Sequence, residues 1–103
     1  MKRMILKASV MDGDGQRYIT VRGQTAKTLK ALVEAGPSGV TALEVSTWAL
    51  RLAAYCHDLR RWHCLDIVTQ RESHPHGWHG RHVLVTPVKI DSIEDGNEQG
   101  VAA

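Results

Sequence analysis

The residues best suited to chemistry are histidines and cysteines, which gather in one stretch of the chain. All six histidines and both cysteines lie within residues 56–82. Zinc requires three or four such ligands that converge at about 2.0–2.3 Å. No standard zinc pattern has the spacing of this set, which includes Cys56, Cys64, His74, His76 and His79. We therefore predict no metal site, although a histidine-rich loop can bind nickel or copper loosely.

The sequence supports a catalytic site no better than it supports a metal site. His57 and Asp58 are neighbours, but adjacency on a helix does not direct two side chains at one substrate. The sequence has no glycine-rich phosphate loop and neither of the common serine hydrolase and zinc protease motifs. We predict that the protein is not an enzyme, and that it uses no cofactor and no small-molecule substrate.

Length and charge set the next bounds. The chain has 103 residues, of which 43% are apolar and 23% charged, as in a single globular domain. Residues 91–103 hold four of the 11 acidic side chains and none of the 13 basic ones, which leaves a net charge of +6 on residues 1–90. A basic body with an acidic tail favours a polyanionic partner such as nucleic acid, although ordinary surface chemistry can produce the same balance.

Three observations predict a cytoplasmic protein without a membrane partner. Cys56 and Cys64 would lie about 12 Å apart along a helix, too far for a disulfide, so both thiols are expected to be reduced. No apolar run approaches the length of a membrane span. The basic start resembles a signal peptide, but Lys7 and Asp12 interrupt the apolar stretch that would have to follow.

The N-terminal residues predict a β-hairpin. Residues 3–10 and 17–22 are expected to form strands, because the second run alternates and is rich in β-branched side chains. Asp12-Gly13-Asp14-Gly15 between them is a turn signal. A calcium loop would need further oxygen ligands and a later glutamate, and none follow in the required pattern.

Helical patterns follow the hairpin. The first helix is predicted from Gln24 or Thr25 to Ala35, because Gly36 and Pro37 provide a stop. Its apolar stripe consists of Ala26, Leu29, Leu32 and Val33. Thr41 and Glu44 form a capping box, which predicts a short second helix beginning at Thr41.

A third helix is predicted from Ala49 to about Arg61, where good helix formers follow one another without glycine or proline. Ser46 and Thr47 provide its N-cap signal. The face expected to be buried contains Ala49, Leu52, Cys56 and Leu59.

The remaining residues predict a second hairpin and a tail. One strand is expected from Leu65 to about Glu72 and its return over residues 83–86, joined by a long polar loop at 73–80. Residues 91–103 lack periodicity and are expected to be a disordered acidic tail. The chain thus divides into an N-terminal β-hairpin extension (1–23), a winged helix-turn-helix domain (24–90) and the tail (91–103).

This order of elements predicts an α+β fold, a three-helix winged helix-turn-helix with a C-terminal β-hairpin wing and an added N-terminal β-hairpin. The sequence also resembles small phage and prophage winged helix-turn-helix proteins over about residues 24–88. The matching pieces are Thr41-Ala42-Leu43-Glu44, the run RLAAYCHDLR that begins at Arg51, and Ile67-Val68-Thr69. The chain departs from that pattern at Tyr55, where the family usually has arginine. It departs again at Trp62-His63-Cys64, where the family usually has a glycine in the turn.

Such a protein is expected to bind double-stranded DNA, with the third helix in a major groove about 12 Å wide and the wing on the backbone. Thr47, Arg51 and Ala54 are the candidates to read bases, because they lie in the first half of that helix. Histidines of the wing that protonate below about pH 6.5 would add phosphate contacts. Further candidate contacts are Lys27, Lys30, Tyr55, Arg61, Trp78, His79 and Arg81.

Two alternatives remain open. One is a homodimer, because a small domain that contacts one half-site usually gains specificity as a dimer. The N-terminal hairpin could then pair with the wing sheet or with a second subunit. The other possibility is a winged-helix adaptor that binds protein without binding DNA. Apolar residues that are expected to be exposed on the DNA-facing side of the third helix favour this adaptor hypothesis. The anchors for a protein partner would be Leu50, Trp62 and Trp78.

Overall fold

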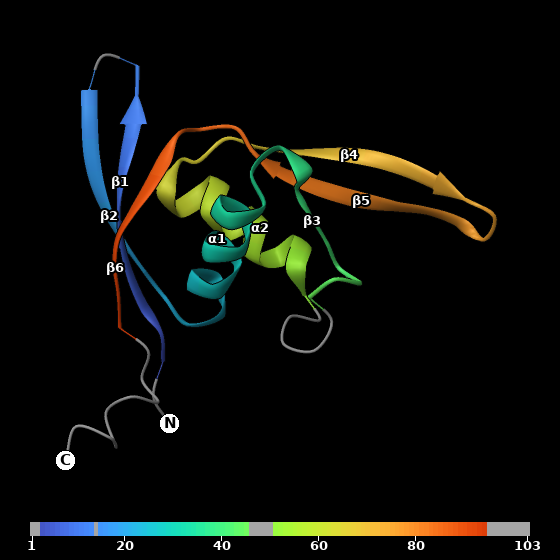
Figure 1. Ribbon diagram of the computed structural model, residues 1–103, viewed down its shortest axis with the longest axis horizontal. Helices are drawn as coiled ribbons and strands as arrows, with labels where there is room; N and C mark the ends of the chain where they lie inside the picture. Colours follow the sequence, from blue (N-terminus) through green and yellow to red (C-terminus); the bar gives the residue numbers. More distant parts are fainter. Residues whose placement is uncertain (1–2, 14, 46–50, 95–103) are drawn as a thin grey trace.

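The structure is a computed structural model that describes residues 3–13, 15–45 and 51–94. Figure 1 shows two sheets on either side of a pair of helices, with one long hairpin projecting from the body. The first sheet has the order β2-β1-β6 and the second the order β3-β5-β4, all antiparallel. The elements are β1 (Ile5–Asp12), β2 (Gly15–Arg22), α1 (Gly23–Ala35), a 3₁₀ turn (Gly36–Ser38), β3 (Val40–Thr41), α2 (Leu52–His63), β4 (Ile67–His74), β5 (Gly77–Leu84) and β6 (Val88–Glu94).

The predicted three-helix winged helix-turn-helix with a C-terminal wing is wrong in its number and order of elements, whereas the α+β class fits. The described residues contain two α-helices and six strands, and β6 follows the second hairpin. The segment predicted as a short helix starts in β3 instead, because Thr41 pairs with Arg81 of β5. Thr47 and Ala49, predicted as the cap and the start of the next helix, lie outside the described residues.

The capping box predicted at Thr41 and Glu44 does form, but it closes a turn. The Thr41 N–H donates to Glu44 Oε1 at 2.9 Å, and the Glu44 N–H reaches Thr41 Oγ1 at 3.4 Å. The Glu44 N–H also bonds the Thr41 carbonyl at 3.1 Å, and Val45 bonds Ala42 at 3.3 Å. These bonds span three residues rather than four, so residues 42–45 form tight turns.

The core lies between the two helices and the β2-β1-β6 sheet. The face of β1 that carries Leu6, Ala8 and Val10 is buried, as strand alternation requires. The helices bury the stripes predicted for them, apart from Val33, which is half-buried, and Ala49, which lies outside the described residues. The buried helical residues are Ala26, Leu29 and Leu32 of α1 and Leu52, Cys56 and Leu59 of α2.

The first helix ends where the sequence predicts. Gly36 adopts φ 55°, a conformation that glycine tolerates because it has no Cβ atom, and its N–H bonds the Leu32 carbonyl. Gly39 has a stricter requirement, because a Cβ atom there would lie 2.7 Å from the His82 carbonyl oxygen. The two glycines together turn the chain from α1 into β3, which pairs with β5.

The N-terminal hairpin forms as predicted, but its first strand spans residues 5–12 instead of 3–10, and its second strand begins at residue 15 instead of 17. It pairs with β6 and not with the β3-β5-β4 sheet. The prediction of a disordered tail from residue 91 is therefore wrong for residues 91–94, which lie in β6. The reason is that Val88, Ile90 and Ile93 pack against the core, a long-range contact that local charge does not reveal.

The predicted polar loop at residues 73–80 is also wrong. His74 pairs with Gly77 and Ser73 with Trp78, so only residues 75 and 76 connect β4 to β5. Cross-strand contacts explain the extra length, because the His79 Nε2 atom lies 2.7 Å from Glu72 Oε1. The resulting β4–β5 hairpin projects well beyond the helices (Figure 1).

Candidate nucleic-acid interface

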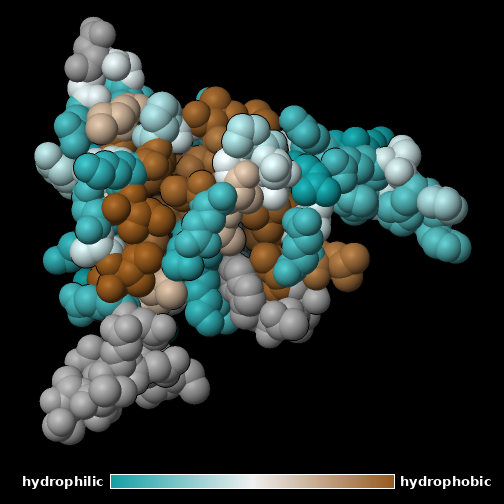
Figure 2. Space-filling model, in the orientation of Figure 1, coloured by the Kyte–Doolittle hydropathy of each residue, from teal (hydrophilic) through white to brown (hydrophobic). Residues whose placement is uncertain are grey.

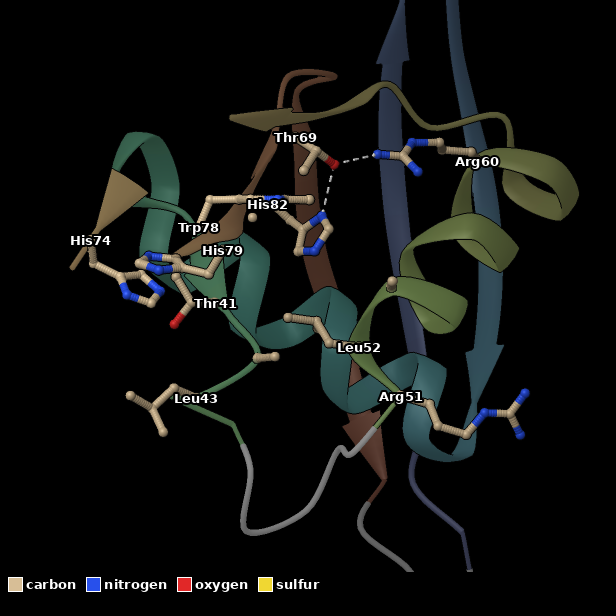
Figure 3. A pocket seen from close by; sticks show the side chains of 13 residues that line it. Thr41, Leu43, Arg51, Leu52, Arg60, Thr69, His74, Trp78, His79 and His82 are labelled. Atoms are coloured by element: carbon tan, nitrogen blue, oxygen red, sulfur yellow. Dashed lines mark hydrogen bonds between the residues drawn. The ribbon is translucent and has the colours of Figure 1, made fainter. Parts of the chain in front are cut away.

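A groove lies between the turn after β3, the start of α2 and the β4–β5 hairpin (Figure 3). Its volume is ≈ 650 Å³. Among the described residues that line it there are two arginines and three histidines, and no aspartate or glutamate. Apolar and small side chains form most of the remaining wall. The lining residues are Thr41, Ala42, Leu43, Arg51, Leu52, Ala53, Arg60, Thr69, His74, Trp78, His79, Gly80 and His82.

Arg51 stands directly before α2 and is exposed. Its φ and ψ angles of −120° and 46° are not helical, so it marks the point where the chain enters the helix. Figure 3 shows its side chain extending away from the β4–β5 hairpin. A guanidinium at this end of α2 can therefore reach a partner that lies beside the helix.

Trp78 is the most prominent side chain of the β4–β5 hairpin. It is 56% exposed, and the Arg71 guanidinium lies 4.1 Å from the centre of its ring. His74 and His79 stack nearby with their ring centres 5.3 Å apart. The hairpin thus presents flat rings and cations together, and Figure 2 shows that its surface on this face is hydrophilic.

Arg81 was a candidate for a backbone contact, and the structure gives it several partners inside the protein. Its Nε donates to Glu72 Oε2 at 2.7 Å, and its Nη1 donates to the Ser38 carbonyl at 3.0 Å. Glu44 Oε1 lies 3.7 Å away. The hydrogen bond to Arg81, assisted by His79, lowers the pKa of Glu72 and keeps that carboxylate charged. These contacts anchor the β4–β5 hairpin to the turn before α2.

Sequence reasoning missed Arg60, which joins α2 to β4. Its Nε donates to the Ile67 carbonyl at 2.8 Å, and its Nη2 donates to Thr69 Oγ1 at 3.1 Å. The Thr69 hydroxyl lies 2.9 Å from Nδ1 of His82, whose pKa is lowered by burial and by the Arg60 charge. Arg60 belongs to the run that resembles the phage proteins, and that run was the only signal for it.

Two comparisons with known proteins found nothing and one found a family. A family model described as a winged helix domain matches residues 18–94. The chain belongs to the winged helix domain family. No curated protein and no solved structure matches it.

The winged helix match runs from within β2 to the end of β6. The family's domain therefore includes all of β6, whose last four residues (91–94) are predicted from the sequence to belong to a tail. It also includes the groove and the whole β4–β5 hairpin. Of the first sheet, only β1 lies entirely outside the matched residues.

Other predicted contacts of this winged helix domain lie away from the groove. Lys27 and Tyr55 line a separate cavity of ≈ 450 Å³ at the start of α1, together with Arg3 and Arg22. Lys30 forms an ion pair with Glu34 at 2.8 Å. The predicted set therefore divides between two places on the surface.

Of four further candidate residues, the structure describes Ala54 and Arg61, and neither lines the groove. Ala54 is half-buried, and the neighbouring Ala53 lines the groove in its place. Arg61 is exposed near the end of α2, with its guanidinium 5.2 Å from the ring centre of Trp62. Thr47 and Leu50 lie outside the described residues.

The part of the winged helix domain that the structure describes has no cluster of metal-binding side chains and holds one buried thiol. No three histidine, cysteine or acidic side chains there lie where they could hold one metal ion. Burial raises the pKa of the Cys56 thiol to about 11, against the lowering effect of Arg60, so the thiol stays protonated and unreactive. No described helix is long and apolar enough to cross a membrane.

Proposed function

We propose that this winged helix protein is a non-enzymatic double-stranded DNA-binding protein of the cytoplasm, a small transcriptional regulator of the phage or prophage type. The observation that carries the proposal is the groove. It lies between α2 and the β4–β5 hairpin, and its described lining has arginines and histidines without a carboxylate. The two arginines of this lining are positively charged at neutral pH and attract the phosphate backbone.

In this proposal α2 enters the major groove and the β4–β5 hairpin rests on the flanking backbone. Arg51 would bond guanine with two hydrogen bonds, worth about 1–3 kcal/mol of discrimination between bases. Thr47 and Ala54 are the further candidates to contact bases. Phosphate or minor-groove contacts would come from Lys27, Lys30, Tyr55, Arg61, Trp78 and His79.

Arg81 has a different part in the proposal. Its guanidinium already bonds Glu72 and the Ser38 carbonyl. We therefore assign it to positioning the β4–β5 hairpin against the 3₁₀ turn that follows α1, with its remaining donors facing the DNA backbone. A homodimer would let the protein read two half-sites.

The test is fluorescence anisotropy of the protein with a random duplex of about 25 base pairs, at about 50 and 200 mM salt. We expect micromolar binding that weakens steeply with salt, because bound phosphates release counterions. The double variant Arg51→Ala/Arg61→Ala should bind at least about tenfold more weakly, while Lys89→Ala on β6 should bind like the wild type. Unchanged DNA binding by the double variant would contradict the proposal.

A second candidate function is a winged-helix adaptor that binds protein and not DNA. Leu43 favours it, because this residue lines the groove and is 83% exposed. Trp62 and Trp78 are also exposed and would serve as anchors. No binding to the duplex at about 50 mM salt would favour this candidate over the first.

A further inference from the structure

The free edges of the two sheets differ in how well they are protected. An edge strand has a row of unpaired N–H and C=O groups that can pair with another chain. In the described residues β2 and β6 are the edges of the first sheet, and β3 and β4 those of the second. Natural proteins protect such edges with bulges, prolines, short strands or covering side chains.

Three of these edges are protected. The β1–β6 register shifts between Lys7 and Ala8, and Asp91 beside this shift accepts a hydrogen bond from the Ser9 hydroxyl at 2.6 Å. Pro87 stands directly before β6. Arg60 covers the base of β4 by bonding the Ile67 carbonyl at 2.8 Å. The remaining edge strand of that sheet, β3, has only two residues.

The β2 edge has no bulge and no proline, and it is not short. It has eight residues, GQRYITVR, with no proline, and its pairing with β1 shows no register shift. Three of the eight residues are β-branched and one is tyrosine, which are types that favour strands. Tyr18 is 75% exposed on the face that points away from the core.

Strand pairing determines which backbone groups β2 leaves free for another chain. The β1–β2 pairs run from Ile5 with Arg22 to Asp12 with Gly15, and bonded and non-bonded pairs alternate. The residue pair that closes a two-residue hairpin connection exchanges backbone hydrogen bonds. The backbone groups of Gly15 and of every second residue after it therefore bond β1. The outward groups therefore belong to Gln16, Tyr18, Thr20 and Arg22. The same rule places the Ile67 carbonyl on the outer edge of β4, where Arg60 bonds it.

The β2 sequence is also complementary to itself when two copies run antiparallel. A register centred on Ile19 pairs all of the outward-facing residues with one another. Tyr18 then lies opposite Thr20 of the second copy, and Gln16 opposite Arg22. Arg17 lies opposite Val21, so no two like charges face each other across the pair.

We propose that the β2 edge binds the β2 edge of a second copy of this chain, in the register centred on Ile19. The two β2-β1-β6 sheets then join into one continuous six-stranded sheet. This proposal rests on the proposed function, which includes a homodimer, and it names the β2 edge as the surface through which the homodimer forms. Because an eight-residue edge buries little area, the dimer is weak and forms at high concentration or on two adjacent half-sites.

The test uses the whole chain without DNA, so its result is independent of DNA binding. Sedimentation velocity from about 1 µM to about 1 mM should show a monomer at the low end and a dimer at the high end. The variants Tyr18→Lys/Thr20→Lys and Tyr18→Glu/Thr20→Glu should each stay monomeric, because residues 18 and 20 of the two copies then carry like charges. An equimolar mixture of the two variants should form the dimer.

A matched control is Val68→Lys/Gln70→Lys, which places the same charges on exposed positions of β4 and should dimerise like the wild type. A wild type that stays monomeric throughout, or a Tyr18→Lys/Thr20→Lys variant that still dimerises, overturns the interface. A monomeric mixture overturns the register. If the variants do not fold, amide exchange of the wild type decides. Protection of the Tyr18 and Thr20 amides should rise with concentration, and equal exchange at both extremes overturns the proposal.

Discussion

Cys64 ends α2 in a backbone conformation that residues other than glycine rarely adopt. Its φ and ψ angles are 54° and 39°, and no other non-glycine residue in the described part of the chain has a positive φ. Its N–H bonds the Leu59 carbonyl, and the Leu65 N–H reaches the same carbonyl at 3.2 Å. Glycine usually occupies this position of a helix end. The resemblance to phage winged helix proteins also implies a glycine in this turn.

We predict that Cys64→Gly increases the free energy of unfolding by up to about 1 kcal/mol. Glycine removes the cost of about 1–2 kcal/mol for a side chain in the left-handed region, and part of that gain is offset by its greater freedom in the unfolded chain. Urea unfolding measures the effect, with Cys64→Ala as the control that removes the thiol and keeps the strain. A Cys64→Gly protein no more stable than Cys64→Ala would contradict the argument.

At the scale of the elements, Arg17 joins the N-terminal hairpin to the end of α2. Its Nη2 donates to the His63 carbonyl at 2.7 Å and to the Cys64 carbonyl at 3.2 Å, and Asp12 holds its Nε at 3.2 Å. The last carbonyls of a helix lack partners within the helix, and a cation there also interacts favourably with the helix dipole. The hairpin that precedes α1 thus supports the helix proposed to contact DNA.

We predict that Arg17→Ala lowers the free energy of unfolding by about 1–2 kcal/mol, because the end of α2 loses a charged donor. Arg22→Ala is the matched control, since this arginine lies on the exposed face of the same strand and should change stability by less than about 0.5 kcal/mol. Equal losses from the two substitutions, measured by urea unfolding, would rule out a specific role for Arg17.

The sequence predicts elements whose signals are local and misses those that depend on distant partners. The stop at Gly36 follows from the residue types there, and the buried positions Leu52, Cys56 and Leu59 of α2 follow from helical spacing; both are confirmed. The sequence does not reveal β6, because its partner β1 lies some 80 residues earlier in the chain. In addition, residues 91–98, which include the end of β6, hold four acidic side chains. The capping box of Thr41 and Glu44 was found, but the pairing of Thr41 with β5 prevents a helix there.

The candidate site shows the same division. Arg51, Trp78 and His79 were predicted as contacts, and the structure places all three on one groove. Composition cannot separate an arginine that faces solvent from one that holds the fold together. Arg60 and Arg81 both bond internal partners, which only the position of β4 and β5 reveals. Whether the groove binds DNA stays a prediction.

For the molecule as a whole, the basic charge serves two purposes. Arg17, Arg60 and Arg81 hold the N-terminal hairpin, α2 and the β4–β5 hairpin in place through backbone carbonyls and nearby side chains. These three arginines keep their charge and still attract a polyanion over distance, but direct contacts must come mainly from cations such as Arg51 and Arg71, which lie at the surface. The net charge of the sequence therefore does not show which cations can contact a partner.

Two histidines, the buried His82 and the half-buried His63, should make the stability of the molecule depend on pH. Burial lowers the pKa of His82 below 6.5, as it does for His63, with nearby arginines adding to the effect. In the unfolded chain both histidines take up a proton near pH 6.5, while the folded protein resists it. The unfolded state then binds more protons, so the contribution of these two histidines to the free energy of unfolding is constant above this pH and falls as the pH drops below it.

We therefore predict that urea unfolding gives a lower stability at about pH 5.5 than at about pH 7.5. Glu72 does not account for this loss, because its pKa is lowered from 4.5 and it acts at more acidic pH. His82→Gln should reduce the difference between the two pH values, because glutamine does not titrate. His76→Gln, in the exposed turn of the β4–β5 hairpin, should leave that difference as it is in the wild type. A His82→Gln protein that loses as much stability as the wild type would show that His82 is not the source.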